Sequence, residues 1–418
     1  MDDTRKAMTV DSLRAELGAW LSGNWDPDLP LLEWRTRLVA AGWAAPSWPT
    51  RWHGRGLPAW ADEVVAAELR AFGAVGPPVG VATGLAGPTI LEHGPDGLRE
   101  RFLLPILTGK ETWCQLFSEP GAGSDLAGLT TRADLDGDEW VINGQKVWNT
   151  SAHHADFGLL VARSNWDAAK HRGLTYFVIP MRQPGIVVRP LRQMNGHASF
   201  NEVFLDDARL PRDNVVGSIG DGWAVARTTL AHERRFGALR FDGHGSASGR
   251  AIEEAGAEIR EVFAPYVWYP QRAGRVDLLV DRARALGRDQ DPVVRQEIAR
   301  VLTLQRVSAW TADRARANRA AGKAPGAEGS IGKLALSVVA RAAARAHSLI
   351  AGASSLLAGA AAPLDGVVTE VVLSVPAQSI AGGTDEIQKN ILGERVLGLP
   401  REPEIDLERP FRELPRNG

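Results

Sequence analysis

Hydrophobic and polar positions follow two different periods along the chain, and the change of period divides it into three regions. In residues 1–112 apolar side chains recur every three to four positions, as in 64–70 and 97–103, which is typical of amphipathic helices. Residues 113–217 instead show short alternating runs between turn signals, and a helical period returns in residues 218–418. The pattern predicts an α+β protein with an N-terminal α-helical domain, a middle antiparallel β domain and a C-terminal helical bundle domain.

The helical regions carry recognisable boundaries. We expect the first helix to be capped near Asp11 or Ser12, because such side chains accept hydrogen bonds from the free N–H groups of a helix start. Residues 47–60 are rich in Trp, Gly and Pro and indicate an irregular loop. Residues 300–320 and 330–350 predict long amphipathic helices of the kind that pack into bundles.

The middle region contains two strong turn signals, Asp136-Gly137 and Asn143-Gly144. Both predict tight hairpins, because these residue types tolerate the positive backbone angles that such turns need. The alternating runs beside and beyond them predict strands at Glu139–Asn143, Leu159–Ala162, Thr175–Ile179, Ile186–Arg189 and Glu202–Leu205.

Composition sets outer limits on the function. A chain of 418 residues with 44% hydrophobic residues can form two or three domains packed together. Its formal net charge of −2 gives no electrostatic reason to expect nucleic acid or an anionic membrane as a partner. Cys114 is the single cysteine, so an intrachain disulfide is excluded, and we expect the protein to lie in a reducing compartment. We expect Cys114 itself to be buried and to behave as a small hydrophobic residue.

We also expect a cytoplasmic protein. The N-terminus lacks the apolar core of a signal peptide. The longest uncharged stretch, Ala346–Leu364, contains Gly352, Gly359 and Pro363, and it predicts a close-packed interior helix rather than a membrane span.

The sequence does not support several other kinds of functional site. Residues 326–334, GAEGSIGKL, hint at a phosphate loop, but Leu334 stands where a metal-binding hydroxyl should be. His153 and His154 have no accompanying carboxylate or cysteine cluster, so we expect no metal site. No GxSxG elbow appears and no GxGxxG follows a strand, which leaves a serine hydrolase and a Rossmann domain without support.

Three separated stretches combine residues suited to ligand binding. Residues 116–125 form a Gly-rich run with hydroxyls, whose backbone N–H groups can approach a flat or anionic ligand. Residues 143–150 contain Trp148, which either packs in a core or stacks on an aromatic cofactor. Residues 380–388 place a glycine break before Thr384, the expected N-cap of a helix whose start can bind a carbonyl or phosphate oxygen.

In this order around a β region, SEPGAGSD, NGQKVW and GGTDEIQKNILGERVLG resemble the acyl-CoA dehydrogenase family over nearly the whole chain. The resemblance implies an N-terminal α domain, a middle β domain and a C-terminal four-helix-bundle domain. It also implies FAD between the β domain and the C-terminal helices, with part of its site supplied by a neighbouring subunit, and an acyl-CoA thioester against one flavin face. In the implied reaction a carboxylate removes the α-proton and the β-hydrogen leaves as hydride to FAD.

Matching residue by residue, the resemblance assigns candidate contacts on all three stretches. The implied cofactor contacts are Gln115, Phe117, Ser118, Gly123, Ser124, Trp148, Thr150, Gly383, Thr384 and Glu386. The implied substrate contacts are Ser124, Arg234 and Gly382.

The base is the point at which this sequence departs from the commonest family pattern. Many members place it directly before Gly-Thr, where this chain has Gly382, while a minority carry it on another helix before an arginine, as in Glu233-Arg234. The missing side chain at Gly382 leaves room for Glu233 to reach the same α-carbon, and the Gly382 N–H can still bond the enolate oxygen. Glu233 is therefore the predicted base, with Arg234 structural or charge-balancing. The alternative is a solvated helix carboxylate paired with an arginine.

A second departure concerns the Arg-x-x-Phe-Gly segment with which many members hold a neighbouring subunit's FAD. It is not evident here, and Arg288, Arg295 and Gln296 are candidate substitutes. Residues 236–290 are also long for this connection. They include the aromatic run FAPYVWYPQ, which either shapes a wide acyl pocket or makes a subunit contact.

The expected partners are an acyl-CoA substrate, an electron-transfer flavoprotein as acceptor, and further subunits in a homo- or hetero-oligomer, either dimer or tetramer. Two alternatives remain: a subunit of a heteromeric acyl-CoA dehydrogenase, and an acyl-CoA oxidase or flavin monooxygenase of the same fold. Acyl length, branching and rings are left open, although the small residues Ala381 and Gly382 hint at room for branched or polycyclic acyl groups.

Overall fold

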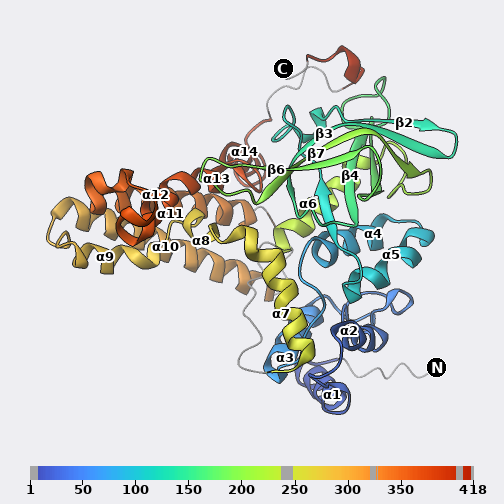
Figure 1. The fold of residues 1–418 in the computed structure, drawn as a ribbon, viewed down its shortest axis with the longest axis horizontal. Coiled ribbons are helices and arrows are strands. Elements are labelled where there is room, and N and C mark those ends of the chain that lie inside the picture. The colour runs from blue at the N-terminus through green and yellow to red at the C-terminus, as the bar shows by residue number, and fades with distance from the viewer. Residues whose placement is uncertain (1–7, 237–247, 321–325, 327, 402–407, 416–418) are drawn as a thin grey trace. The chain divides into compact units, whose positions relative to one another are not determined.

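The protein is described by a computed structural model that covers residues 8–236, 248–320, 326, 328–401 and 408–415 (Figure 1). The chain forms two compact units. The first comprises Met1–Leu191, Ser199–Ala264 and Asp406–Gly418, and the second comprises Arg192–Ala198 and Pro265–Ile405. The first unit joins helices to a sheet and the second is helical, which confirms the predicted α+β fold.

The first unit begins with α1 to α5, which are Val10–Asn24, Leu31–Ala40, Trp60–Phe72, Gly87–His93 and Asp96–Thr108. The start of α1 corrects the predicted cap. Thr9, not Asp11 or Ser12, is the N-cap, because its hydroxyl accepts from the Ser12 N–H while the Ser12 hydroxyl accepts from the Thr9 N–H. Ser12 is therefore the third residue of the helix and closes the capping box.

Seven strands form one sheet in the first unit. They are β1 Trp113–Leu116, β2 Arg132–Asp136, β3 Glu139–Thr150, β4 Phe157–Arg163, β5 Leu174–Pro180, β6 Ile186–Leu191 and β7 Phe200–Pro211. The strand order is β1-β4-β2-β3-β7-β6, with β5 paired to β4. Most pairs are antiparallel, but β1 and β2 each run parallel to β4. All five predicted strands lie inside observed ones, whereas β1 and β2 were not predicted.

The two turn signals have different outcomes. Gly137 sits in the two-residue loop between β2 and β3 at φ +61°, as predicted. Asn143-Gly144 was predicted to be a hairpin but lies inside β3, where the pairing with β7 shifts register. A Cβ at Gly144 would lie 2.8 Å from the Cα of Thr131, the residue before β2, so the close approach of that backbone requires glycine here.

Two later helices also belong to the first unit. The apolar residues Val225 and Ala226 of α6, Gly222–Phe236, pack in the same core cluster as Tyr176 of β5. Helix α7, Arg250–Phe263, is held to α2 by an ion pair of 2.7 Å between Arg35 and Glu258. The predicted domain boundary at 217/218 therefore differs from this division, because α6 and α7 bury their faces against the sheet and the N-terminal helices.

The second unit is built around two long helices. Its elements are α8 Tyr269–Arg272, α9 Leu279–Ala285, α10 Pro292–Ala320, α11 Glu328–Ala351, α12 Val367–Ser374, α13 Pro376–Ile380 and α14 Asp385–Arg395. The predicted helices at 300–320 and 330–350 are confirmed as parts of α10 and α11. Val301 of α10 and Ala343 and Ala346 of α11 lie in one buried cluster.

The uncharged stretch Ala346–Leu364 is not the single interior helix predicted. Helix α11 ends at Ala351, where Gly352 adopts φ +57°, and short 3-10 turns follow at Gly352–Leu356, Gly359–Ala361 and Pro363–Gly366. Leu356 is 84% exposed. A left-handed glycine therefore ends the helix and brings this stretch to the surface.

By length and composition alone, Gly329–Leu356 and Pro363–Arg395 could each cross a membrane. The second stretch is broken into α12, α13 and α14, and its Asp385 forms ion pairs with Lys333 and Arg341 of the first. These are properties of helices packed against each other within a folded protein. The expectation that a membrane is not a partner stays a prediction.

Candidate active site

Four segments of the first unit meet around the end of β1. The Gln115 carbonyl on β1 accepts from Asn149 Nδ2 on β3 at 2.8 Å, and the Gln115 Nε2 donates to Glu233 Oε2 on α6 at 3.3 Å. The loop after β1 is joined to β3, because the Val147 N–H donates to the Ser118 carbonyl at 2.9 Å. The structure therefore brings the loop, β3 and α6 together at residues predicted to serve one site.

A buried ion pair holds this loop in place. The Lys146 side chain is 0% exposed, and its ammonium donates to Glu119 Oε1 at 2.8 Å, to the Phe117 carbonyl at 3.0 Å and to the Val161 carbonyl at 2.8 Å. The Glu119 carboxylate also accepts from the N–H groups of Thr130 at 2.7 Å and Thr131 at 2.9 Å. One pair of charges thus fixes the loop, β3 and β4 at a single point.

The electrostatics of the pair follow from its burial. Burial alone would raise the pKa of Glu119, but the Lys146 ammonium and the hydrogen bonds from Lys146, Thr131 and Thr130 together lower it to about 2. Burial lowers the pKa of Lys146, and the Glu119 charge opposes that shift. The carboxylate is therefore ionised at neutral pH.

A second cation supports the far side of the loop. The buried Arg163 guanidinium donates to the carbonyls of Ala127, Leu129 and Lys170, and it lies 3.3 Å from the ring centroid of Phe411. Since its donors are used on backbone carbonyls, Arg163 acts as a brace for residues 127–129.

The predicted loop contacts divide into buried and exposed groups. Phe117 is 4% exposed and packs edge-on against Tyr176 at 5.8 Å, so its side chain belongs to the core and its carbonyl is held by Lys146. Ser118 is half-buried, while Gly123 and Ser124 are exposed. A Cβ at Gly123 would meet no atom within 4 Å. The loop is therefore exposed at Gly123 and Ser124, with open space beside Gly123.

Trp148 is unusual for an aromatic residue in a strand. Its side chain is 55% exposed, its φ is +64°, and the pairing of β3 with β7 is irregular between Lys146 and Asn149. A left-handed backbone is strained for a bulky residue and is found where the surrounding structure enforces it. The irregularity turns the indole out of the core, with Phe200 as an edge-on neighbour at 5.9 Å.

These features fit a flat aromatic cofactor such as FAD. The exposed Trp148 ring offers a stacking surface, and the Ser118–Ser124 loop offers the exposed residues Gly123 and Ser124 for contact with a ligand. Thr150, at the end of β3, is half-buried and pairs with Phe200.

Glu233 lies on α6 and is half-buried. One helical turn earlier, the fully buried Thr229 hydroxyl lies 3.0 Å from the Thr89 hydroxyl and 3.0 Å from the Tyr176 hydroxyl. Because residues four apart lie on the same helix face, these bonds direct Glu233 toward the sheet. The side chain of Arg234 lies outside the described residues.

On the second unit the predicted contacts lie at the start of α14 and in the turn that leads into it. Gly382 and Gly383 adopt φ +69° and +85°, and the Thr384 hydroxyl accepts from the Ile387 N–H, which confirms it as the helix N-cap. Gln388 Nε2 donates to the Gly382 carbonyl at 3.2 Å. A Cβ at Gly382 would meet nothing within 4 Å, and Glu386 is exposed.

Arg288 and Gln296, the substitutes proposed for a neighbouring subunit's FAD, lie just before α10 and in its first turns. Arg288 pairs with Asp291 at 2.8 Å, Gln296 is exposed on α10, and Arg295 donates to the Asp289 carbonyl. In the aromatic run 263–271, Trp268 is 1% exposed, whereas Val267 is 63% exposed.

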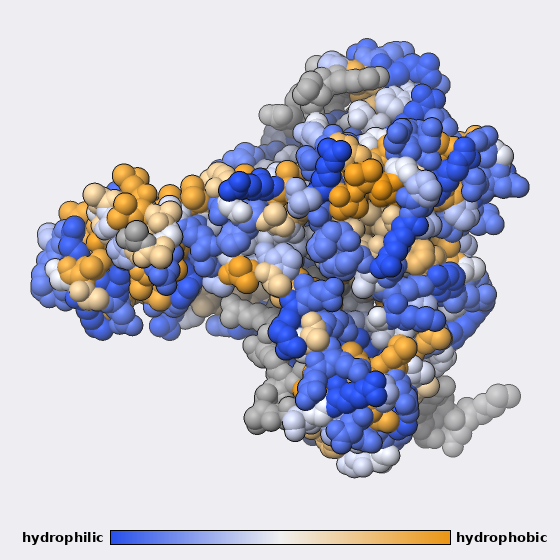
Figure 2. All heavy atoms as spheres, viewed as in Figure 1, coloured by the Kyte–Doolittle hydropathy of each residue, from blue (hydrophilic) through white to orange (hydrophobic). Residues whose placement is uncertain are grey.

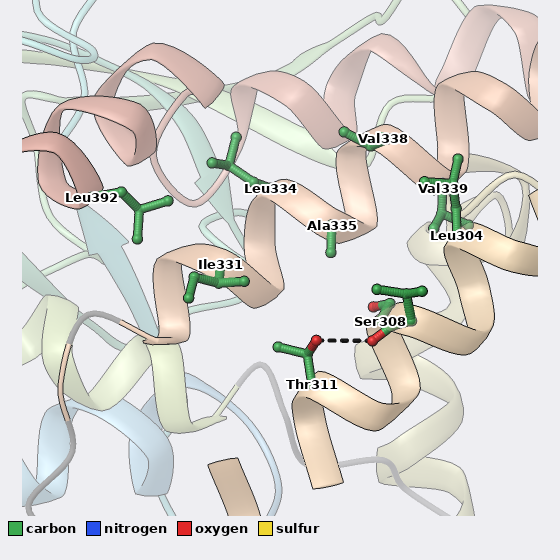
Figure 3. A pocket seen from close by; sticks show the side chains of 10 residues that line it. Leu304, Ser308, Thr311, Ile331, Leu334, Ala335, Val338, Val339 and Leu392 are labelled. Atoms are coloured by element: carbon green, nitrogen blue, oxygen red, sulfur yellow. Dashed lines mark hydrogen bonds between the residues drawn. The ribbon is translucent and has the colours of Figure 1, made fainter. Parts of the chain in front are cut away.

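An apolar groove of about 300 Å³ lies between α10, α11 and α14 (Figure 3). Its polar lining residues are Ser308 and Thr311 alone. It therefore contains no acid or base and is not the candidate active site. Among the described residues, no group of three or more His, Cys, Asp or Glu side chains is placed to hold a metal ion.

Sequence patterns missed Glu119, Lys146 and Thr229, although the first two lie inside the quoted motifs. A signal for Lys146 existed: Trp140 and Ile142 are buried on the inner face of β3, and a period of two places Lys146 on that face. A lysine at an inward position predicts a buried partner. Cys114, by contrast, is fully buried as predicted, and burial raises its pKa.

Family models match three parts of the chain. The N-terminal domain of acyl-CoA dehydrogenases matches residues 16–110, their middle domain matches 114–208 and their C-terminal domain matches 274–397.

Individual relatives agree with these matches. Acyl-CoA dehydrogenase IpdE1 of Mycobacterium tuberculosis is 35% identical over 440 residues, covering 94% of this chain and 98% of that protein. Acyl-CoA dehydrogenase FadE34 of the same organism is 37% identical over 373 residues, covering 89% of this chain and 47% of that protein. Among solved structures, the Tcur3481-Tcur3483 steroid ACAD has a TM-score of 0.65 at 26% identity, covering 96% of this chain and 100% of that one. The ChsE4-ChsE5 complex of M. tuberculosis has a TM-score of 0.64 at 26% identity, covering 95% and 100%.

Proposed function

The chain belongs to the acyl-CoA dehydrogenase family, and we propose that it oxidises an acyl-CoA thioester between its α- and β-carbons with Glu233 as the base. The observation that carries the proposal is the position of Glu233, whose carboxylate reaches Gln115 beside the loop and strand of the flavin-type motifs. This favours a base over the alternative of a solvated helix carboxylate.

FAD supplies the acceptor for the hydride that leaves the β-carbon. The residues proposed to hold it are the Ser118–Ser124 loop, Trp148 and Thr150. The family resemblance also makes Gly383, Thr384 and Glu386 proposed FAD contacts. Trp148 would stack on the ring system and exclude water, because its indole is already turned out of the core. Arg288 and Gln296 remain proposed contacts to the FAD of a neighbouring subunit.

The proton transfer needs a carboxylate that is ionised and partly shielded from water. Glu233 is half-buried, and the hydroxyl cluster of Thr229, Thr89 and Tyr176 fixes the helix turn below it. The thioester oxygen gains negative charge as the α-proton leaves, so backbone N–H groups that bind this oxygen lower the barrier. The exposed N–H groups of the flavin loop and of Gly382 are the proposed donors, and Ser124 and Arg234 are proposed substrate contacts.

We propose a bulky, ring-bearing acyl group as the substrate class. A structure that resembles this chain over its whole length is described as a steroid ACAD. The Ala381-Gly382 pair agrees with a wide acyl group, since both residues are exposed and a side chain at Gly382 would meet open space. A straight-chain fatty acyl thioester would be used less well.

We also propose that the protein works as an oligomer, with an electron-transfer flavoprotein as acceptor. Large apolar side chains are exposed on the second unit, and Figure 2 shows hydrophobic residues gathered around α12; they include Leu356, Leu364, Val372 and Leu373. Two structures that resemble the chain are complexes of two different chains, so a mixed assembly is the competing form.

The base is tested by adding acyl-CoA thioesters to the flavin-loaded protein without oxygen. Wild type should lose its flavin absorbance with a ring-bearing thioester, whereas Glu233→Gln should bind FAD and thioester but stay oxidised. Glu253→Gln, an exposed carboxylate on α7, is the matched control and should behave as wild type. Bleaching of Glu233→Gln at the wild-type rate removes Glu233 from the role.

Two measurements distinguish the alternatives for the enzyme type and for the assembly. Slow reoxidation in air after bleaching favours a dehydrogenase, and fast reoxidation favours an oxidase or monooxygenase. Light scattering and flavin content of the chain expressed alone distinguish a homo-oligomer, which should retain FAD, from a chain that needs a different partner.

A further inference from the structure

The Gln115 side chain makes a hydrogen bond to the proposed base. Its side chain donates an N–H from Nε2 to Glu233 Oε2 at 3.3 Å, joining β1 to α6 across 118 positions of sequence. The resemblance alone would assign Gln115 to the flavin. Its side-chain amide is instead directed at the predicted base.

The two residues joined by this hydrogen bond both lie in regular secondary structure, Gln115 in β1 and Glu233 in α6. Gln115 pairs with Leu159 in the parallel ladder of β1 and β4, and its carbonyl accepts from the buried Asn149 at 2.8 Å. Glu233 follows the buried Thr229 by one helical turn. The two side chains therefore meet because sheet and helix are fixed, without a flexible loop between them.

The chemistry of the amide suits a base. An ionised carboxylate has only acceptors, so Gln115 must present its NH2 group, and this bond occupies one of the several acceptor sites of the Glu233 carboxylate. A neutral donor favours the ionised carboxylate without cancelling its charge, whereas a lysine or arginine in this place would weaken it as a base much more.

We propose that Gln115 is a positioning residue, which aims the Glu233 carboxylate from β1 and keeps it ionised. This inference rests on the proposed role of Glu233. It predicts that loss of the amide donor lowers kcat and moves the acidic limb of the pH profile upward, while the affinities for FAD and thioester change little.

The variants must leave the other titratable side chains near α6 unchanged, so that a shift of the pH profile can be assigned to Glu233. Helix α6 packs against the turn Ala82–Ala86 and against α4, β4 and β5. The titratable and charged groups on these elements and on α6 itself, apart from Glu233, are Glu92, His93, Arg163, Tyr176, Arg227, His232, Arg234 and Arg235.

The experiment uses flavin-loaded Gln115→Met, which keeps the length but loses the donor, and Gln115→Glu, which puts a like charge beside Glu233. The midpoint of the acidic limb of kcat/KM should rise by about 0.5 to 1 pH unit in Gln115→Met, equivalent to about 3- to 10-fold, and further in Gln115→Glu. Gln305→Met, at an exposed position of α10 outside the proposed site, is the control and should leave the profile unchanged. Gln115→Asn is the fallback variant in case Gln115→Met or Gln115→Glu does not fold. Its amide is one methylene too short to reach Glu233, so its pH profile should show the shift expected for Gln115→Met.

A second readout does not need turnover. Titration of 13C-labelled glutamate carboxyls in the apoprotein, with Glu233→Gln identifying the Glu233 signal, should show the same upward shift in Gln115→Met. An unmoved limb and an unmoved signal in Gln115→Met overturn the inference, even when Glu233→Gln is inactive. Should Glu233→Gln keep full turnover, the proposed base fails, and the carboxyl titration still decides whether Gln115 holds this carboxylate.

Discussion

Replacing Glu119 by Gln tests the claim that one buried ion pair holds the cofactor loop. The carboxylate is 6% exposed, faces the fully buried Lys146 ammonium at 2.8 Å and accepts three further hydrogen bonds from Thr130 and Thr131. Glu119→Gln leaves the Lys146 charge buried without its counter-charge, which costs about 3–5 kcal/mol. We expect the thermal midpoint of the first unit to fall by about 6–12 °C.

The lowered pKa of Glu119 gives a second estimate of how much the ion pair stabilises the fold. A folded-state pKa of about 2, against an ordinary value of 4.5, corresponds to about 3 kcal/mol at 1.36 kcal/mol per pH unit. Because the folded pKa is the lower one, this contribution is complete above pH 4.5 and is lost as pH falls toward about 2. Wild type should therefore lose stability steeply in this range, and Glu119→Gln less so.

The assay is unfolding by heat and by urea, followed through tryptophan fluorescence, for Glu119→Gln, Lys146→Met and the double variant. The double variant should be more stable than Glu119→Gln, since it no longer buries an unpaired charge. It should not reach wild type, because the carbonyls of Phe117 and Val161 lose their donor. Simple addition of the two single losses would refute the reasoning.

Three further changes have defined outcomes. Trp148→Ala should weaken FAD binding by about 10-fold, measured by flavin fluorescence titration, with little loss of stability because the ring is 55% exposed. Gly383→Ala should cost about 1–3 kcal/mol in urea unfolding, since φ is +85° and the new Cβ would lie 2.5 Å from Gln388 Nε2. Thr229→Val should lower the free energy of unfolding by about 1–3 kcal/mol and reduce kcat, because the Tyr176 hydroxyl would lose its buried partner.

Local patterns in the sequence were sufficient for much of the fold. Period-two alternation located β6 and β7, and helical spacing located α10 and α11, because each depends on burial of one face of a single element. The Gly144 bulge could not be predicted in this way. Asn-Gly is a turn signal, and the role of this glycine inside β3 depends on the close approach of Thr131, which comes from another part of the sequence.

The candidate site shows the same limit. Family motifs placed the exposed residues, such as Trp148 and Ser124, that a ligand can touch. The residues that hold them rest on long-range contacts: Lys146 and Glu119 are separated by 27 positions, and Gln115 and Glu233 by 118. Such pairs are brought together by strand order and helix docking, which local periodicity does not contain.

The central claim, that the Glu233 carboxylate takes the α-proton, is tested most directly by hydrogen exchange. A thioester blocked at its β-carbon is incubated with flavin-loaded enzyme in heavy water, and deuterium at the α-carbon is followed by NMR or mass spectrometry. Wild type should incorporate deuterium, while Glu233→Gln, with the same thioester affinity, should not. Incorporation by Glu233→Gln at the wild-type rate would show that another group takes the proton.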